Sequence, residues 1–275
     1  MNQEIFRIYQ NKMILEPSSF NNDEYYYFYG SDGKIFGIEK NITDNEYKLL
    51  KTFYLEKKIQ NTNKNTEEIY NYIYNGGTYP FNKKLNFLLY KAKTNHTEIN
   101  ALLKEALNNV IEITIDDVEV IFYDDDQNVN IAELFQTISD DFGYAVNVHV
   151  GLKLNKNIQG SFLTHYIGCI INAGYFNKRF SNLIDIVFSR DASKMYSLVK
   201  EIKLQILNPV LNKNNNLETL DAFFQNDLNV SKTAKVLYLN RNSLINRLDI
   251  ISKELGFDVQ SFKYAACVLI MINLV

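Results

Sequence analysis

Apolar residues recur at helical spacing near the C-terminal end of the chain. Four of them, separated by steps of four, three and four, are Leu244, Leu248, Ile251 and Leu255. Side chains with this spacing share one face of a helix. Asn240 can cap the start of this helix, and Gly256 can end it. The opposite face then exposes Arg241, Asn242, Ile245, Asn246 and Asp249.

Short amphipathic segments flank this helix. The apolar positions predict helices over Leu217–Phe224, Lys232–Leu237 and Gln260–Leu274. The residues of the first helix expected to face inward are Leu217, Leu220, Phe223 and Phe224. We expect Ser231 to cap the second helix, Tyr238-Leu239 to form the tight turn after it, and Ala234 to allow a close helix crossing. Together these elements predict a helix-turn-helix domain.

The middle of the chain alternates between strand and helix patterns. The expected strands are Leu85–Tyr90, Val110–Ile115, Val118–Tyr123 and Val146–Val150, and the expected helices are Glu98–Leu107, Ile131–Ile138 and Gly160–Tyr175. The order strand, helix, strand, strand, helix, strand is typical of a ferredoxin-like or nucleotide-cyclase-like α/β sandwich. A fold of this kind does not by itself specify a chemistry.

The N-terminal part predicts a small unit of its own. Tyr25–Tyr29 and Lys34–Glu39 read as a hairpin, and Thr43 with Glu46 forms a capping box at the start of a helix. The polar run Gln60–Thr66 is expected to be a loop, and a second helix over Glu67–Tyr74 is expected to stop at Gly76-Gly77.

Four segments follow from these patterns. They are an N-terminal α+β sensor or dimerisation unit (residues 1–80), a degenerate cyclase-like α/β domain (81–190), a connecting helix (191–212) and an all-α helix-turn-helix domain (213–275). The connecting helix is expected over Ala192–Leu207, with Pro209 ending it. The fold class is therefore α+β and multidomain, which suits a chain of 275 residues.

Composition narrows the functional classes. Apolar residues make up 46% of the chain and charged residues 22%, which is typical of a folded globular protein. A net charge of −3 argues against non-specific coating of nucleic acid. Neither a membrane-spanning run nor a secretory signal is recognisable, so we expect a cytoplasmic protein without a membrane partner. The abundance of Asn, Lys, Ile and Tyr suggests a bacterial source.

The C-terminal residues offer a chemistry for reading DNA. Arg and Asn can form paired hydrogen bonds with guanine and adenine edges in the major groove, while Lys, Ser and helix N-termini hold phosphates. The candidate DNA-binding residues are Ser231, Lys232, Lys235, Asn240, Arg241, Asn242, Ser243, Asn246 and Arg247. From Asp227 to Gly256 the formal charge is only +2. We therefore expect a homodimer that doubles the contacts with double-stranded DNA.

The same stretch resembles the C-terminal helix-turn-helix of PucR/CdaR-type regulators. The matching positions, without gaps, are Ser231, Thr233, Ala234, Leu237, Tyr238, Arg241, Asn242, Leu244, Arg247, Leu248 and Gly256. The resemblance implies a sequence-specific transcription regulator with a degenerate cyclase-like domain before the DNA-binding domain. Members of that family commonly have His, Thr, Tyr and Arg where this chain has Asn240, Ser243, Asn246 and Ile250. These changes favour a different operator.

Other functional classes remain open. The chain could be an interaction or scaffold protein with a vestigial helix-turn-helix. An active nucleotide cyclase would need a Gly-Gly turn with carboxylates, and the turn Ile115–Val118 lacks glycine. Asp124-Asp125-Asp126 is expected to be a solvated turn rather than a magnesium site. The three histidines, His96, His149 and His165, lack metal-ligand spacing. We expect no enzyme activity, metal or cofactor, but leave room for an unknown small-molecule effector.

Overall fold

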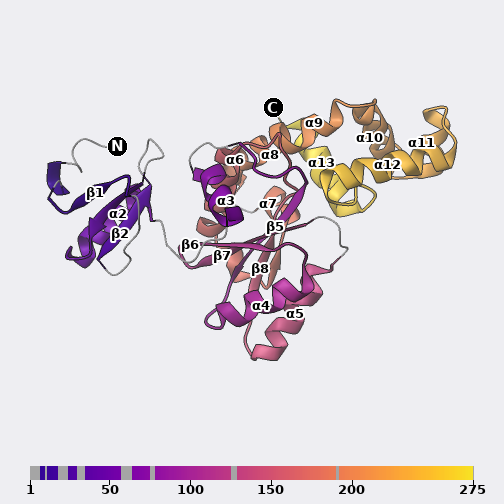
Figure 1. Cartoon of the computed structure of the whole chain (residues 1–275). Helices are drawn as coiled ribbons and strands as arrows, with labels where there is room; N and C mark the ends of the chain where they lie inside the picture. The colour runs from indigo at the N-terminus through magenta and orange to yellow at the C-terminus, as the bar shows by residue number, and fades with distance from the viewer. Residues whose placement is uncertain are drawn as a thin grey trace. The chain divides into compact units, whose positions relative to one another are not determined.

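The computed structural model describes residues 7–9, 11–17, 24–29, 35–56, 64–74, 78–124, 129–189 and 192–274. The chain forms two compact units, Met1–Gly77 and Thr78–Val275 (Figure 1). The protein is an α+β protein, as its sequence predicts, with a C-terminal group of helices. In the part of the chain that is described, no helix has the length and apolar character needed to cross a membrane.

The first unit is built on a small antiparallel sheet with the order β1-β3-β2-β4. Its strands are β1 (Met13–Leu15), β2 (Tyr25–Tyr29), β3 (Ile35–Glu39) and β4 (Leu55–Glu56). The predicted hairpin is confirmed, because β2 pairs with β3 over its whole length. Its turn, residues 30–34, lies outside the described residues.

Helices α2 and α3 also belong to this unit. Helix α2 (Asp44–Phe53) begins with the predicted capping box, in which Thr43 N donates to Glu46 Oε2 at 2.8 Å and Glu46 N donates to Thr43 Oγ1 at 3.3 Å. Helix α3 (Lys64–Tyr74) starts earlier than predicted, because Thr66 is buried within its first turn rather than placed in a loop. Gly76-Gly77 lies outside the described residues.

The second unit contains a five-stranded sheet with the order β6-β7-β5-β8-β9. Its strands are β5 (Leu85–Lys91), β6 (Ile111–Ile115), β7 (Val118–Asp124), β8 (Asn147–Val150) and β9 (Phe180–Ser181). Every pairing among β5 to β8 is antiparallel. The order and pairing of these four strands are those of the predicted ferredoxin-like sandwich, and β9 adds a parallel edge strand.

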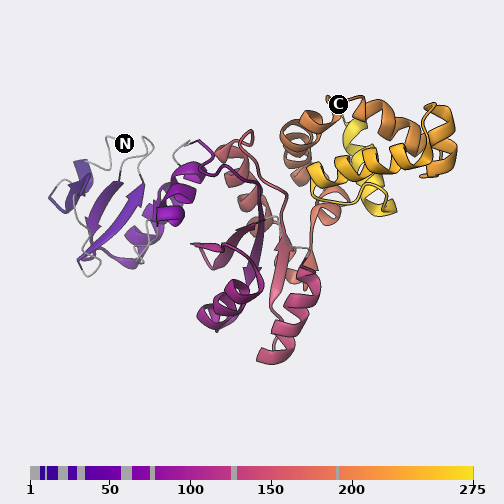
Figure 2. The same cartoon turned by 45° about the vertical axis from the view of Figure 1, so that its right-hand side comes forward.

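Helices cover both faces of this sheet. Helices α4 (His96–Ala106) and α5 (Ile131–Phe142) share one apolar core with strand residues such as Leu88 and Ile121, and they lie on the same side of the sheet (Figures 1 and 2). On the other face, α6 (Gly160–Asn172) places the Tyr166 ring edge-on against Phe87, with ring centroids 5.4 Å apart. Two covered faces explain why all seven residues of β7 are buried.

The segment after α6 is more broken than the sequence predicts. Helix α6 ends at Asn172 instead of Tyr175, because Gly174 adopts a positive φ of 71° before the short 3-10 turn η1 (Tyr175–Asn177). A further short helix, α7 (Leu183–Val187), was not predicted. Asn182 caps it and donates a side-chain hydrogen bond to the Tyr264 hydroxyl at 3.3 Å.

The connecting helix does not end before Pro209, so that prediction is wrong. Helix α8 (Ala192–Ile202) continues through the π-helical turn η2 (Lys203–Leu207) into α9 (Asn208–Leu211). In η2, Asn208 N donates to Lys203 O, five residues back. Proline lacks an N–H and clashes with the carbonyl four residues before it in an ordinary helix. The wider π turn changes this hydrogen-bonding pattern and lets the chain remain helical.

A fully buried histidine joins three elements of the second unit. Nδ1 of His149, on β8, lies 2.8 Å from Ser181 Oγ. Its Nε2 lies 2.8 Å from the Tyr166 hydroxyl. Burial lowers the pKa of His149 from 6.5 to about 3. The imidazole is therefore neutral, and its two ring nitrogens connect β8, β9 and α6.

Acid should destabilise the fold through this residue. Burial lowers the pKa of His149 in the folded state. As the pH falls from 6.5 towards 3, His149 is therefore protonated in the unfolded chain but not in the folded chain, which favours unfolding. We expect His149 to contribute a loss of about 2 kcal/mol in unfolding free energy between pH 7 and pH 5. Urea unfolding of wild type and His149→Gln at both pH values measures this difference. Equal pH dependence of the two proteins would contradict it, and the half-exposed His165→Gln serves as control.

Candidate nucleic-acid interface

The C-terminal part of the second unit is a group of four helices. They are α10 (Asn216–Gln225), α11 (Val230–Val236), α12 (Arg241–Leu255) and α13 (Phe262–Asn273), drawn in orange and yellow in Figure 2. The predicted stripe of α12 is buried in full, and Ala234 of α11 is buried as well. Helices α11 and α12, joined by a four-residue turn, form the helix-turn-helix pair.

Local signals fix the ends of these helices. Asn240 caps α12 as predicted, since its side chain accepts a hydrogen bond from Ser243 N at 2.7 Å. Gly256 ends α12 with φ +83°. The predicted cap of α11 is wrong, because Asn229 rather than Ser231 caps it by accepting from Lys232 N at 3.0 Å. Asn is as good a cap as Ser, and it stands two residues earlier.

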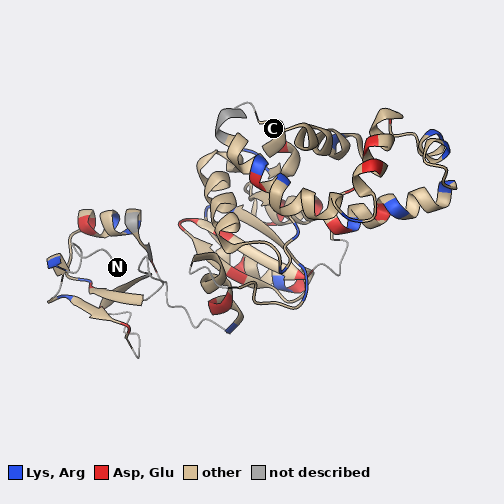
Figure 3. Cartoon of the chain, turned by 90° about the horizontal axis from the view of Figure 1, so that it is seen from above, with Lys and Arg blue, Asp and Glu red and all other residues tan. Residues whose placement is uncertain are grey.

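Eight of the nine candidate residues are exposed. On α11 these are Ser231, Lys232 and Lys235, and at the turn and along the first half of α12 they are Asn240, Arg241, Asn242, Ser243 and Asn246. Figure 3 shows the basic residues of α11 and of the start of α12 at one end of the C-terminal helices. We call these eight residues the α11–α12 face.

Arg247 lies elsewhere. Its side chain is half-buried, and Nη1 donates to Thr219 Oγ1 of α10 at 2.9 Å. Thr219 is fully buried. Arg247 therefore ties α12 to α10 from within the domain. The inward positions of α10 also differ from prediction, because Leu217 is exposed while Thr219 and Ala222 are buried.

Tyr238 is not among the residues that the sequence predicts to bind DNA. It lies in the turn between α11 and α12, is 97% exposed and has φ +54°. The left-handed backbone conformation is unfavourable for a tyrosine, and an exposed ring gains no stabilisation from burial. Its position in the turn of a helix-turn-helix pair, directly before the helix expected to contact bases, is the feature of the sequence that could have indicated a role in DNA binding.

The electrostatics of the α11–α12 face favour an anion. Neither α11 nor α12 has an acidic residue in its first turn. Helix N-termini present unpaired N–H groups and the positive end of the helix dipole. Lys232, Lys235 and Arg241 add three cationic side chains nearby. The face can therefore hold phosphates and still offer Arg and Asn groups to base edges.

Two carboxylates of the α/β sandwich, Asp124 and Glu119, are buried and paired with neighbouring elements. Asp124 is buried, forms an ion pair with Lys83 and accepts from Asn109 Nδ2 at 2.6 Å. The prediction of a solvated turn is therefore wrong for Asp124, which is the buried last residue of β7, while Asp125 and Asp126 lie outside the described residues. Among described positions, no group of three or more His, Cys, Asp or Glu residues could hold a metal ion.

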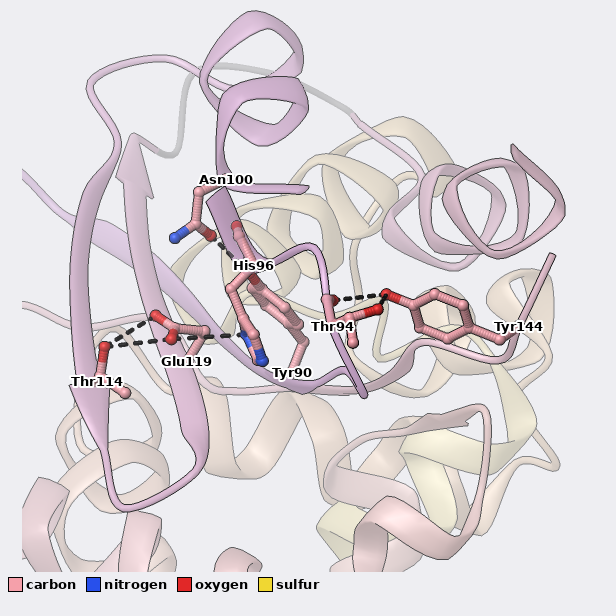
Figure 4. Close-up of polar contacts among 7 residues, drawn as sticks. All are labelled: Tyr90, Thr94, His96, Asn100, Thr114, Glu119 and Tyr144. Atoms are coloured by element: carbon pink, nitrogen blue, oxygen red, sulfur yellow. Dashed lines mark hydrogen bonds and ion pairs between the residues drawn. The ribbon is translucent and has the colours of Figure 1, made fainter. Parts of the chain in front are cut away.

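Glu119 is the centre of a second internal polar cluster, shown in Figure 4. Thr114 Oγ1 donates to its carboxylate at 3.2 Å, and His96 Nδ1 lies 3.7 Å from Oε1. Burial raises the pKa of the Glu119 carboxyl. In the same close-up, the Tyr90 hydroxyl donates to Asn100 Oδ1 at 2.7 Å. The cluster fastens the β6–β7 hairpin to the start of α4.

These features define a helix-turn-helix domain with a polar, exposed face. Residues 216–273 match the PucR C-terminal helix-turn-helix domain family, and this part of the chain is such a domain. An uncharacterized protein, YxkF, of Bacillus subtilis (strain 168) is 44% identical over 48 residues, which are 18% of this chain and 16% of that protein. The match therefore spans about a sixth of the relative's length.

A solved structure is also similar. It is the crystal structure of a regulator of polyketide synthase expression from Bifidobacterium adolescentis, with 12% sequence identity and a TM-score of 0.38. The similarity covers 71% of this chain and 81% of that chain.

The two arginines of α12 should behave differently on substitution. Arg247→Ala removes a charged donor to buried Thr219 and should lower the unfolding free energy by about 1.5 to 3 kcal/mol. Arg241→Ala, at an exposed site, should change it by less than about 0.5 kcal/mol. Urea unfolding of both variants measures the difference. Equal effects would show that Arg247 does not hold α10 and α12 together.

Proposed function

We propose that this protein is a transcription regulator that binds double-stranded DNA through its α11–α12 face. One observation carries the proposal: the capped first turn of α12 exposes Arg241 and Asn242 on a domain of the PucR helix-turn-helix type. In such domains the N-terminal residues of the second helix read base edges in the major groove. Arg suits guanine and Asn suits adenine.

The remaining residues of the face take supporting roles in this proposal. Ser231, Lys232 and Lys235 lie on α11 and would hold backbone phosphates. Ser243 and Asn246 continue the exposed side of α12 beyond Asn242 and would contact neighbouring bases. Asn240 already caps α12 with its side chain, so it would act by orienting the helix.

We further propose that the regulator acts as a homodimer. The formal charge of +2 between Asp227 and Gly256 is small for one domain to hold DNA, since affinity depends on the number of phosphates neutralised. Two copies double these contacts and read two half-sites. The first unit and the α/β sandwich would then serve assembly or sensing.

DNA binding can be tested without knowing the operator. Full-length protein selects from a pool of random-sequence duplexes, and fluorescence anisotropy then gives the affinity for the enriched duplex. Arg241→Ala should weaken binding about 10- to 100-fold, as expected for loss of a paired contact with one base. A dimer should enrich two half-sites about 10 base pairs apart, centre to centre.

The matched control is Arg179→Ala, which removes an exposed arginine from the α/β sandwich. It should bind the enriched duplex like wild type. No enriched duplex from a folded protein would contradict the regulator proposal and favour an interaction protein with a vestigial helix-turn-helix. Enrichment of a single half-site would contradict only the dimer.

Tyr238 provides a separate test of the same face. Asn tolerates the left-handed backbone better than Tyr, so Tyr238→Asn should leave the unfolding free energy unchanged or raise it by up to about 1 kcal/mol. If the ring contacts DNA, the same change should weaken binding about three- to tenfold. Thermal unfolding and anisotropy measure the two effects. Tyr196→Asn, an exposed tyrosine on α8, is the control for DNA binding. Unchanged affinity would remove Tyr238 from the interface.

A further inference from the structure

A cavity of about 240 Å³ lies at a junction within the second unit. Four segments line it: the loop before β5, the loop after β8, the η2–α9 part of the connecting helix with the residues after it, and the end of α12. The ionisable residues of the lining are Lys83, Lys84, Lys153, Lys156, Lys213 and Glu254. Five lysines and one glutamate thus line one small cavity in a chain whose net charge is −3.

The walls of this cavity are tied together. Leu85 N donates to Leu154 O at 3.1 Å and Leu154 N donates to Leu85 O at 2.7 Å, which holds the two loops side by side. Gln159 N donates to Gln205 Oε1 of the connecting helix at 3.1 Å. Hydrogen bonds between segments far apart in sequence therefore hold together the segments that carry the lysines.

Two of the lysines join the cavity to α12. Lys153, only 7% exposed, donates from Nζ to Lys253 O at 2.9 Å, at the negative end of the helix dipole. Lys213 forms an ion pair with Glu254 at 2.8 Å. The cavity thus touches the C-terminal end of the helix whose other end exposes Arg241.

The lysine charges are only partly balanced. Lys83 pairs with Asp124 and Lys213 with Glu254. Lys84 and Lys156 are exposed and form no ion pair with any residue that the structure describes. Like charges gathered around a cavity repel one another and raise the local concentration of anions. The side-chain amides of Asn82, Asn155 and Asn157 add hydrogen-bonding groups to the lining.

From these contacts we infer that the cavity binds a small free polyanion carrying phosphate or carboxylate groups. Its volume equals that of roughly eight water molecules at about 30 Å³ each, which suits pyrophosphate or a three-carbon phosphorylated acid. Lys ammonium groups bind phosphate as point charges, so several are needed around one ligand. An anion held there contacts the α/β sandwich, the connecting helix and α12 together.

The ligand is a free anion and not the phosphate of bound DNA. Glu254 and Arg241 lie at opposite ends of α12, about 20 Å apart at 1.5 Å per residue. DNA on the α11–α12 face would be read at the far end of this helix. The inferred site goes beyond the proposed DNA binding and does not depend on it, so its test needs no DNA.

Inorganic pyrophosphate is the probe for this site. Isothermal titration of the full-length protein, in sodium chloride at matched ionic strength, should show saturable binding with one site per chain. The double variant Lys84→Gln/Lys156→Gln should bind at least tenfold more weakly. Both side chains are exposed, so the variant should fold, and thermal unfolding without ligand verifies this.

The matched control is Lys93→Gln/Lys200→Gln, which removes two exposed lysines outside the cavity lining and so causes the same change in net charge. It should bind pyrophosphate like wild type. If both double variants bound pyrophosphate equally weakly, binding would depend on net charge alone, and this result would contradict the proposed site. Absence of saturable binding by folded wild-type protein would overturn it as well. Competition by duplex DNA at equal affinity would assign the lysines to the DNA backbone instead.

Discussion

Burial of one stripe of α12 decides which side chains the C-terminal domain offers to a partner. Leu244, Leu248, Ile251 and Leu255 are all fully buried in the domain. With these side chains fixed inward, the helical period forces Arg241, Asn242 and Asn246 outward. The chemistry of the exposed face therefore depends on the packing of its opposite side.

The C-terminal end of α12 is held by polar contacts in addition to the burial of Ile251 and Leu255. Lys153 approaches the last carbonyls of the helix from the α/β sandwich, and Lys213 reaches Glu254 from the segment after α9. The π turn η2 keeps this connecting segment helical through Pro209. Any ligand that strengthens these contacts would act on the position of α12, because both contacts are made to its last turn.

Residue types associated with catalysis have structural roles in the α/β sandwich. His149 is kept neutral by burial and bonds Ser181 and Tyr166, while Glu119 and Asp124 each have partners on neighbouring elements. A buried polar group without a partner is costly, so such networks favour one arrangement of strands and helices. The hydrogen bonds of His149 to Ser181 and Tyr166 therefore fasten β8 to β9 and α6.

The sequence alone determined the features that depend on neighbours along the chain. The stripe of α12, its cap Asn240, its end at Gly256, the capping box at Thr43 and the succession of strands and helices along the sandwich all follow from periodicity and local hydrogen bonding. The helix-turn-helix resemblance rests on the same local spacing, and the family match to residues 216–273 agrees with it.

Only the tertiary structure decided what depends on distant residues. Arg247 has a side chain that could contact DNA. Its guanidinium instead donates a hydrogen bond to Thr219 on α10, inside the domain. Tyr238 is exposed because nothing in the described structure covers the turn that forces its backbone to positive φ. Lys83, Lys156 and Lys213 meet around one cavity although long stretches of chain separate them. Periodicity reports which face of an element is buried, whereas the partners of a long polar side chain are set by how the elements pack.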